Sequence, residues 1–509
     1  MNNFQYNLTT GQFHRPAAKS KERFYSAGSS DSFVGWDVGD VSANAAWYPQ
    51  ALKVLARARD LERNNDYVRA FLRLNKVNVI GPKGIKLRSC RKNNRRNPDK
   101  VFNDLFEADY VSSGKIKNSP TVEGGLSRRD MGDMWLDRLA VDGEVILIRR
   151  YSTKYNKYGY ARQFVDAAQL DHSLNGRGYP LAENNNILKM GVEFDDDARP
   201  VAYHFLTEHP TEHIWQTNEK REHVRVEAKF VEHSYFRERP GQVRGVPLIA
   251  PGATRARMLD KFEEAIAVGS RVAASKMLFY KPNDDWDGGG DDGAEPGVED
   301  DDELHLRQEV EPGMAERLPR GLDVETFDPS YPPGNLDEFI QAMGRGLASS
   351  VGGDYTMMFN DLKGTSYSTL RQAAISQRDV YRCLQAFYIE HHLEPDLHCW
   401  AEAALLSGSM RGDETKVRLL LEDECYRFQP RGWQWVDPAK DMAANQSALE
   451  SNLTSEQRLV EELHGEDYEV ILDEKADFKK AAEKRGLKVF EGLQAAQQSD
   501  DDDNGEQED

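Results

Sequence analysis

The stretch MLDKFEEAIAVGSRVAASKMLFY, Met258–Tyr280, repeats its apolar residues at the spacing of one helical face. A 3.6-residue period of this kind predicts an amphipathic α-helix. Many of the residues are alanine, glycine or serine, and small side chains let a neighbouring helix approach closely. The predicted apolar stripe consists of Leu259, Phe262, Ile266, Gly269 and Ala273.

A second helix is predicted beyond an acidic tract that follows the first. The tract, Asn283–Glu303, is rich in glycine and aspartate, so it cannot form a packed core and is expected to be solvated. A β-like patch at residues 321–327 comes next, and Asn335 with Glu338 then resembles a capping box. One face of this second helix carries Leu336, Phe339, Ile340, Met343 and Leu347.

The rest of the chain predicts an α+β fold. The polar first 45 residues are typical of a mobile arm. One helix is predicted from Ala46 to Leu61, and a second from an Asp66 N-cap to Ile80. Residues 131–236 predict a helix at 131–141, then strands at 144–151, 162–165, 201–206 and 229–236. After a loop at 354–367, a long helix from Ser368 and polar helices after 436 complete the prediction.

Charge is distributed unevenly along the chain. The 509 residues carry a formal net charge of −20, yet residues 51–100 contain fifteen Lys/Arg against four Asp/Glu. A protein that grips nucleic acid over its whole surface needs dense positive charge. The composition therefore excludes a general nucleic-acid-coating protein, while it permits one that handles DNA without holding it.

The sequence shows neither a membrane span nor a disulfide framework. No stretch reaches about eighteen uninterrupted apolar residues, and Arg271 and Lys276 break the most apolar candidate. The N-terminal residues lack the apolar core of a signal peptide, so synthesis in a cytosol is expected. The cysteines Cys90, Cys383, Cys399 and Cys425 are far apart and are expected to be free thiols.

Catalytic and metal-binding motifs are not found. No phosphate-binding G-x-x-x-x-G-K-[ST] loop or G-x-S-x-G elbow occurs. His209 and His213 are separated by Pro210, and His391, His392, His398 and Cys399 by Pro395, which is expected to interrupt the helix that a shared site needs. In the acidic tract, Gly289 occupies a position where an EF-hand needs an oxygen ligand. We expect no enzyme, no metal and no cofactor.

Six segments, in order, resemble the lambda-type portal protein family of tailed bacteriophages. The chain is similar to that family from about Trp47 to Gly465, and in GVEFDDDARPVAYHF Ala198 stands where the family pattern has glycine. The matching segments are ARARDLERNNDYVRAFLRLNKVNVIGPKGIKL (Ala56–Leu87), DGEVILIRR (Asp142–Arg150), GVEFDDDARPVAYHF (Gly191–Phe205), VEHSYFRERPGQVRGVPLIAP (Val231–Pro251), SYSTLRQA (Ser366–Ala373) and WVDPAKD (Trp435–Asp441).

The resemblance implies a portal fold with a mainly helical wing, stem and crown and a small β-containing clip, assembled as a ring around an axial channel. Its implied parts are a flexible arm (1–45), a wing (46–254 and 369–434), stem helices (255–280 and 335–352), a clip (281–334), a tunnel loop (353–368), a crown (435–490) and a disordered acidic tail (491–509).

The resemblance also implies roles for particular side chains. Lys363 and Arg371 are candidates for transient phosphate contacts, with ordinary surface charges or ion-pair partners as the equal alternative. The basic residues between 57 and 96 are expected to pair with acids of neighbouring subunits rather than with DNA. The implied sites are the stem residues Phe262, Ile266, Gly269, Ala273, Phe339 and Met343, the tunnel-loop residues Asp354, Asn360, Lys363, Thr365 and Arg371, and the motor-docking clip residues Arg317, Arg320 and Glu325.

The function implied is a non-enzymatic ring, typically a homododecamer, at one capsid vertex of a virion assembled in the host cytoplasm. Double-stranded DNA would pass through it during packaging and ejection. Its implied partners are the terminase large subunit, the major capsid and scaffold proteins, and head-tail adaptors, with no membrane. The alternatives are another structural head-tail adaptor, or a DNA-packaging enzyme, which would require the nucleotide-binding and metal-binding motifs that the sequence lacks.

Overall fold

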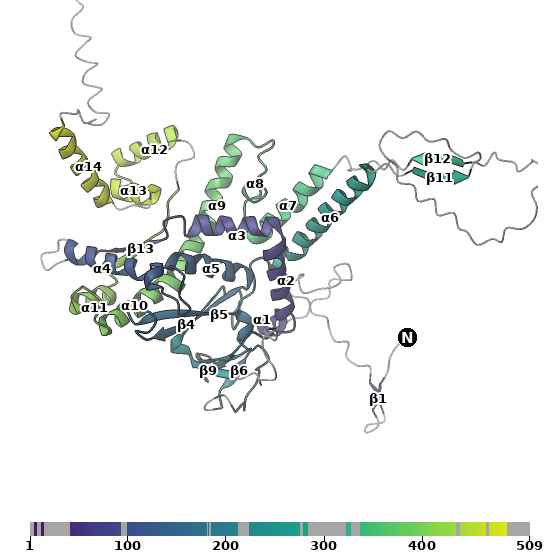
Figure 1. The fold of residues 1–509 in the computed structure, drawn as a ribbon, viewed down its shortest axis with the longest axis horizontal. Coiled ribbons are helices and arrows are strands. Elements are labelled where there is room, and N and C mark those ends of the chain that lie inside the picture. The colour runs from purple at the N-terminus through teal and green to yellow at the C-terminus, as the bar shows by residue number, and fades with distance from the viewer. Residues whose placement is uncertain are drawn as a thin grey trace, which may run out of the picture. The chain divides into compact units, whose positions relative to one another are not determined.

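A computed structural model shows two compact units, which are described separately (Figure 1). The first contains residues 1–256 and 346–509, and the second residues 257–345. The structure describes residues 5–7, 12–14, 41–92, 99–180, 182, 185–211, 223–274, 278–282, 322–326, 336–433, 438–464 and 468–485.

The first unit begins with short strands and three helices. Contrary to the single helix predicted from Ala46, the chain breaks between α1 and α2, because a proline at position 49 has no N–H to continue the helical hydrogen bonds. Asn65, not Asp66, caps α3: its side-chain oxygen accepts a hydrogen bond from the Val68 N–H at 2.8 Å. These elements are β1 (Gln5–Asn7), β2 (Gln12–His14), α1 (Ala43–Trp47), α2 (Ala51–Asn64) and α3 (Asp66–Val79).

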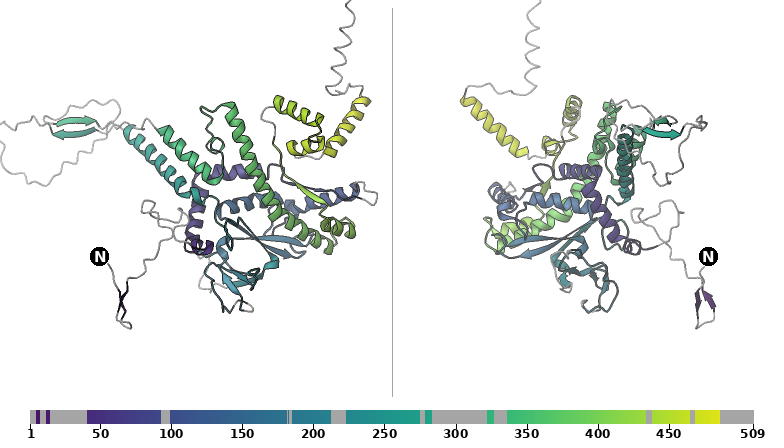
Figure 2. Two further views of the ribbon diagram at one scale, coloured as in Figure 1. Left: turned by 180° about the vertical axis from the view of Figure 1, so that it is seen from behind. Right: turned by 45° about the vertical axis from the view of Figure 1, so that its right-hand side comes forward.

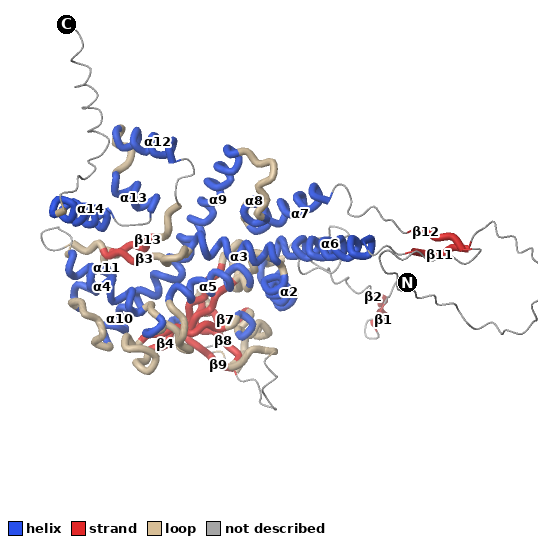
Figure 3. The backbone as a smooth tube through the Cα atoms, turned by 45° about the horizontal axis from the view of Figure 1, so that its top comes forward, coloured by secondary structure: helices blue, strands red, loops and turns tan. Residues whose placement is uncertain are grey.

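The centre of the first unit is an antiparallel sheet of order β10-β4-β5. Helix α5 lies against it (Figures 1 and 3). Ser127 and Asp130 form a capping box at the start of α5, which fixes where this helix begins. The predicted helix and strands at these positions are confirmed to within three residues. The elements are α5 (Arg128–Val141), β4 (Glu144–Tyr151), β5 (Tyr160–Val165) and β10 (Val231–Tyr235).

The first unit contains two further sheets of four and two strands. A four-stranded antiparallel sheet has the order β6-β7-β8-β9, and β13 pairs with β3. Ala198 in the β7–β8 turn has φ +60°, the left-handed conformation that favours glycine, which explains why the family pattern has glycine there. The strands are β3 (Lys86–Ser89), β6 (Ile187–Lys189), β7 (Val192–Phe194), β8 (Pro200–Leu206), β9 (His223–Glu227) and β13 (Tyr426–Gln429).

Helix α9 (Tyr367–Tyr388) continues without interruption through a π-helical turn, η5 (Ile389–Leu393), into α10 (Glu394–Leu406). The prediction that Pro395 interrupts this stretch is therefore wrong. It falls in the first turn of α10, where proline's missing N–H is tolerated, and the π turn shifts the hydrogen-bonding register just before it.

The first unit contains six further helices among the described residues, which Figure 2 shows from two sides. The polar helices predicted after residue 436 are confirmed as three separate helices. The predicted loop at 354–367 is wrong in part, because Asp354 caps a short helix there by accepting from the Met357 N–H. The helices are α4 (Lys100–Ser113), α8 (Tyr355–Phe359), α11 (Glu414–Glu422), α12 (Pro438–Glu450), α13 (Glu456–His464) and α14 (Tyr468–Lys484).

The second unit contains most of α6 (Ala250–Ala274) and the start of α7 (Leu336–Val351). The first helix was predicted to reach Tyr280, but it begins earlier and ends at Ala274. The difference arises because Leu278–Pro282 (β11) pairs in register with Leu322–Thr326 (β12) in an antiparallel ribbon. The β-like patch predicted at residues 321–327 is thus confirmed.

Candidate functional site

Two of the matching segments meet at a buried carboxylate, Glu144. It stands at the start of β4 and is 4% exposed. Arg244 Nε donates to its two oxygens at 2.8 and 3.0 Å, the Gly245 N–H donates at 3.0 Å, and His233 Nε2 lies 2.9 Å away. Burial raises the pKa of Glu144, but the Arg244 charge and the His233 contact outweigh it and lower the pKa to about 2.

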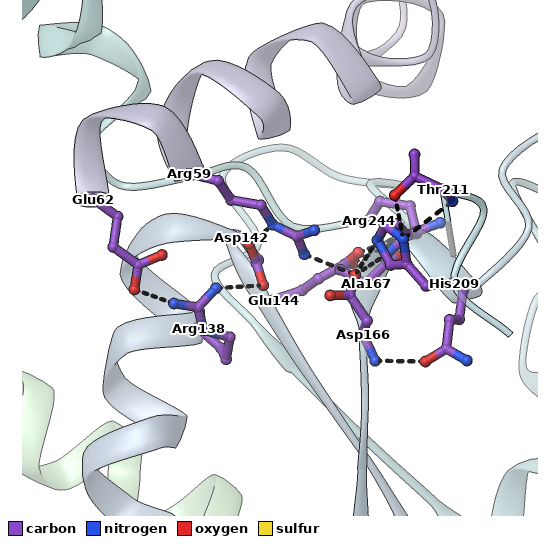
Figure 4. A network of polar contacts seen from close by, with 12 residues as sticks. Arg59, Glu62, Arg138, Asp142, Glu144, Asp166, Ala167, His209, Thr211 and Arg244 are labelled. Carbon is purple, nitrogen blue, oxygen red and sulfur yellow. Dashed lines mark hydrogen bonds and ion pairs between the residues drawn. The ribbon is translucent and has the colours of Figure 1, made fainter. Parts of the chain in front are cut away.

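Arg244 also binds the backbone on its other side. Its guanidinium donates to the carbonyl oxygens of Ala167 at 2.8 Å, Leu170 at 3.1 Å and Met190 at 3.1 Å. A planar guanidinium with five donors suits such a junction better than the single ammonium of lysine. Arg244 therefore ties β4 to two distant loops, and Figure 4 shows it beside Glu144 and Ala167.

Two glycines allow these segments to touch. Gly143 has φ +82°, and a Cβ placed on it would lie 2.2 Å from the Val246 carbonyl carbon. A Cβ on Gly245 would lie 2.1 Å from the Gly143 carbonyl oxygen. Because both obstructing atoms are backbone, only glycine fits at either position. The segments Asp142–Arg150 and Val231–Pro251 thus match the family pattern at positions that pack against each other.

The basic segment pairs within its own chain. Arg59 donates to Asp142 at 2.8 Å and to Asp166 at 2.7 Å, and Arg138 contacts Asp142 and Glu62 (Figure 4). Arg59 thus has acidic partners within its own chain, and pairing of the basic segment with neighbouring subunits stays a prediction. The other internal pairs are Lys76–Asp137 (2.9 Å), Arg88–Glu107 (3.0 Å) and Arg91–Asp99 (3.1 Å).

A second buried cluster surrounds Arg162, which is 0% exposed. Its guanidinium lies 3.1 Å from Asp396 and 3.5 Å from Glu232. Arg128 also contacts Asp396, at 2.9 Å. A buried charge survives only when it is paired in this way. This cluster was not predicted from the sequence, although an arginine inside the otherwise apolar start of a strand, YARQFV, was a usable signal.

One of the histidines considered as metal ligands, His392, is a buried packing residue. His392 is 0% exposed, and its ring lies 4.9 Å from the Tyr388 ring and 5.6 Å from the Trp135 ring. Burial lowers the pKa of His392 well below its usual range. Among the residues that the structure describes, no three His, Cys, Asp or Glu side chains are grouped so that they could hold a metal ion. His213 lies outside them.

The predicted tunnel-loop residues are not brought into one cluster, and several have local structural roles. Asp354 is the N-cap of α8, and Asn360 ends that helix with φ +51°. The Thr365 N–H donates to the Leu362 carbonyl at 3.3 Å, and the Lys363 N–H donates to the Asp361 carboxylate at 3.1 Å. Arg371 donates to Asp441 of α12 at 2.5 Å, so it is an ion-pair partner.

Two predicted stem residues meet in the second unit. The rings of Phe262 on α6 and Phe339 on α7 lie 4.4 Å apart, and the two helices run side by side (Figure 1). Phe339 remains 43% exposed. Ile266, Gly269 and Met343 are half-buried on the same helices, and Ala273 is near the end of α6.

Of the three predicted clip residues, one lies among the residues that the structure describes. Glu325 lies on β12 opposite Phe279 of β11. Arg317 and Arg320 lie outside the described residues, as do the acidic tract and Asn335.

Comparison with known proteins identifies the class. The family described as phage portal protein, lambda family, matches residues 29–385. The chain therefore belongs to the lambda family of phage portal proteins, as the sequence predicted. A probable portal protein of Halomonas phage phiHAP-1 is 32% identical over 396 residues, which are 78% of this chain and 74% of the relative. The chain accordingly has the function of a phage portal protein.

Solved structures give weaker similarities. A chain in the virion of a native gene transfer agent particle aligns with 81% of this chain and 93% of its own length, at 13% identity and a TM-score of 0.37. A chain in the neck of the empty particle aligns with 79% and 92%, at 14% identity and the same TM-score. No helix among the described residues is both long enough and apolar enough to span a membrane.

Proposed function

We propose that this portal protein assembles as a homo-oligomeric ring, a dodecamer, at one vertex of the capsid. Double-stranded DNA passes through its axial channel during packaging and again during ejection. The observation that carries the proposal is the family match, which extends over residues 29–385 and includes the helices α6 and α7. The virion is its location, and the host cytoplasm is where it is assembled.

The parts of the ring are proposed with the boundaries that the resemblance implies. Residues 46–254 and 369–434 form the wing, 255–280 and 335–352 the stem, 281–334 the clip, 353–368 the tunnel loop and 435–490 the crown, between an arm (1–45) and an acidic tail (491–509). The contact of Phe262 with Phe339 supports a paired stem. The clip binds the terminase large subunit and then head-tail adaptors, and the wing binds capsid and scaffold proteins.

The charge of the chain supports a sliding contact with DNA. Each copy has a formal net charge of −20, and a ring of copies multiplies it. Like charge repels phosphate, which lowers the tendency of DNA to adhere as it moves. Lys363 and Arg371 are the candidates for transient phosphate contacts, although the Arg371 guanidinium also pairs with Asp441. The ring acts by geometry and electrostatics, without catalysis.

Electron microscopy of the purified full chain tests the proposal. Class averages viewed along the particle axis are expected to show an annulus with a central hole and twelve repeats. A Phe262→Ala, Phe339→Ala variant, which removes the only ring pair identified between α6 and α7 in the described residues, is expected to give fewer intact annuli. A population of compact single subunits from the unaltered chain at high concentration would refute ring assembly.

A further inference from the structure

A pocket of the first unit lies between the sheet β6-β7-β8-β9 and the chain that follows β10. Its volume is about 670 Å³, within the range of about 300–1,000 Å³ that is typical of ligand sites. The walls come from residues 189–203 and 233–243, so both walls fall largely in segments that match the family pattern. The buried clusters described above do not account for this hollow.

The lining of the pocket combines aromatic rings with positive charge. Lys189 and Arg237 lie over aromatic rings of the wall, with Nζ 5.4 Å from the Phe194 centroid and Cζ 5.4 Å from the Tyr235 centroid. Tyr203 adds a third ring. The charged side chains of the lining are Lys189, Arg199, Arg237, Arg239 and Glu238, besides His233 beside Glu144. Such a surface favours a ligand that carries apolar rings and negative charge together.

The N-terminal part of the chain approaches the rim of this pocket. The Asn44 side chain donates to the Gly241 carbonyl at 2.8 Å and accepts from the Val243 N–H at 3.0 Å. Gly241 and Val243 both line the pocket. Asn44 is therefore held at the edge of this pocket. The family match also begins at residue 29, well before α1.

The sequence immediately before this anchor has the complementary chemistry. DSFVGWDVGD, Asp31–Asp40, contains three aspartates, one phenylalanine, one tryptophan and no Lys or Arg. An extended chain covers roughly 3.3–3.6 Å per residue, so the eight residues from Trp36 to Asn44 reach about 27 Å. That length is ample for a pocket whose rim Asn44 already touches.

We propose that the segment Asp31–Asp40 binds in this pocket of its own chain, with Phe33 and Trp36 against the aromatic wall and the aspartates beside the cations. A segment tethered so close has an effective concentration in the millimolar range, which favours its own pocket over that of another chain. The inference concerns one subunit, and it stands or falls independently of ring assembly.

Hydrogen exchange of the full-length protein, read by mass spectrometry, provides the first test. Amides of residues 33–38 are expected to exchange at least about tenfold more slowly than an unstructured peptide, as an opening free energy of about 1.4 kcal/mol gives. The Arg199→Glu, Arg237→Glu variant is expected to lose this protection. Arg177→Glu, which reverses a cation outside the pocket, is the matched control and should keep it. Unprotected amides in the unaltered chain, or equal loss in both variants, overturn the proposal.

A photo-cross-link separates the possible occupants. With p-benzoylphenylalanine in place of Trp36, irradiation of the full chain is expected to join it to peptides of residues 189–203 or 233–243 within one chain, at monomer mass on a denaturing gel. A cross-link at dimer mass, one to another surface, or none at all overturns the proposal. A second charge reversal, Asp37→Arg with Arg237→Glu, is expected to restore part of the lost protection.

Discussion

The Glu144–Arg244 cluster and the segment at 353–371 both carry charged residues that match or adjoin family-like sequence, but they use the charges differently. In the cluster, the carboxylate is 4% and the arginine 7% exposed, and every described contact ties one distant segment to another. In the segment at 353–371, Asp354 caps a local helix, and the Arg371 side chain is 31% exposed. The family-like motifs DGE and R-G-V-P therefore hold distant segments together, while the charges of residues 354 and 371 make a local cap and a partly exposed ion pair.

This difference predicts the largest effect for Arg244→Met. The change leaves Glu144 buried without its main partner, which costs about 3–5 kcal/mol of unfolding free energy. Denaturant unfolding at neutral pH measures the loss. The control is Arg177→Met, whose pair with Asp196 is exposed and 3.7 Å long, and which should cost below about 0.5 kcal/mol. Equal losses in the two variants would contradict a structural role for the cluster.

Gly143→Ala tests the close approach of the two segments. Alanine adds strain at positive φ and a clash with the Val246–Pro247 backbone, together worth about 3 kcal/mol. Gly84→Ala is the matched control, since Gly84 has φ +72° with nothing within 4 Å of the added Cβ, so it should lose about 1 kcal/mol. Thermal unfolding midpoints compare them. Equal decreases in the two unfolding midpoints would contradict the close contact between Gly143 and the Val246–Pro247 backbone.

The pH dependence of stability isolates Glu144. Its pKa is lowered from 4.5 to about 2 in the folded protein, so the ionised carboxylate stabilises the fold above pH 4.5 and this contribution is lost as the pH falls toward 2. The lost contribution is about 3 kcal/mol. Between pH 5 and pH 2 the Glu144→Gln variant should therefore lose less stability than the unaltered protein. Parallel unfolding curves against pH would show that Glu144 is not the group responsible.

The smallest effect is expected for Arg371→Gln. Its pair with Asp441 is partly exposed, so unfolding free energy should change by less than about 1 kcal/mol, while amides of α12 exchange faster. Arg382→Gln, which breaks a pair with Asp379 inside α9, should leave α12 unchanged. If Arg371→Gln leaves α12 exchange unaltered, the pair does not hold that helix in solution, and a phosphate contact by Arg371 becomes the stronger interpretation.

Sequence periodicity predicted the helices and strands that the residue pattern within the element itself specifies. The predicted ranges of α5, β4, β8 and β10 lie within three residues of the observed ones, although the capping box that starts α5 was not foreseen. The end of α6 was wrong because a non-local pairing, β11 with β12, competes with helix continuation. The π turn before Pro395 was missed because a one-residue shift in hydrogen bonding leaves almost no trace in the apolar pattern.

The sequence by itself determined the family, several of the helices and strands, and the negative charge of the chain, since these depend on residue identity and short-range spacing. Only the tertiary structure decided that Glu144 meets Arg244, that Arg162 is buried beside Asp396, and that Arg59 of the basic segment pairs with Asp142. Ion pairs between residues a hundred or more positions apart form because folding desolvates them together, and no local pattern records which buried charge finds which partner.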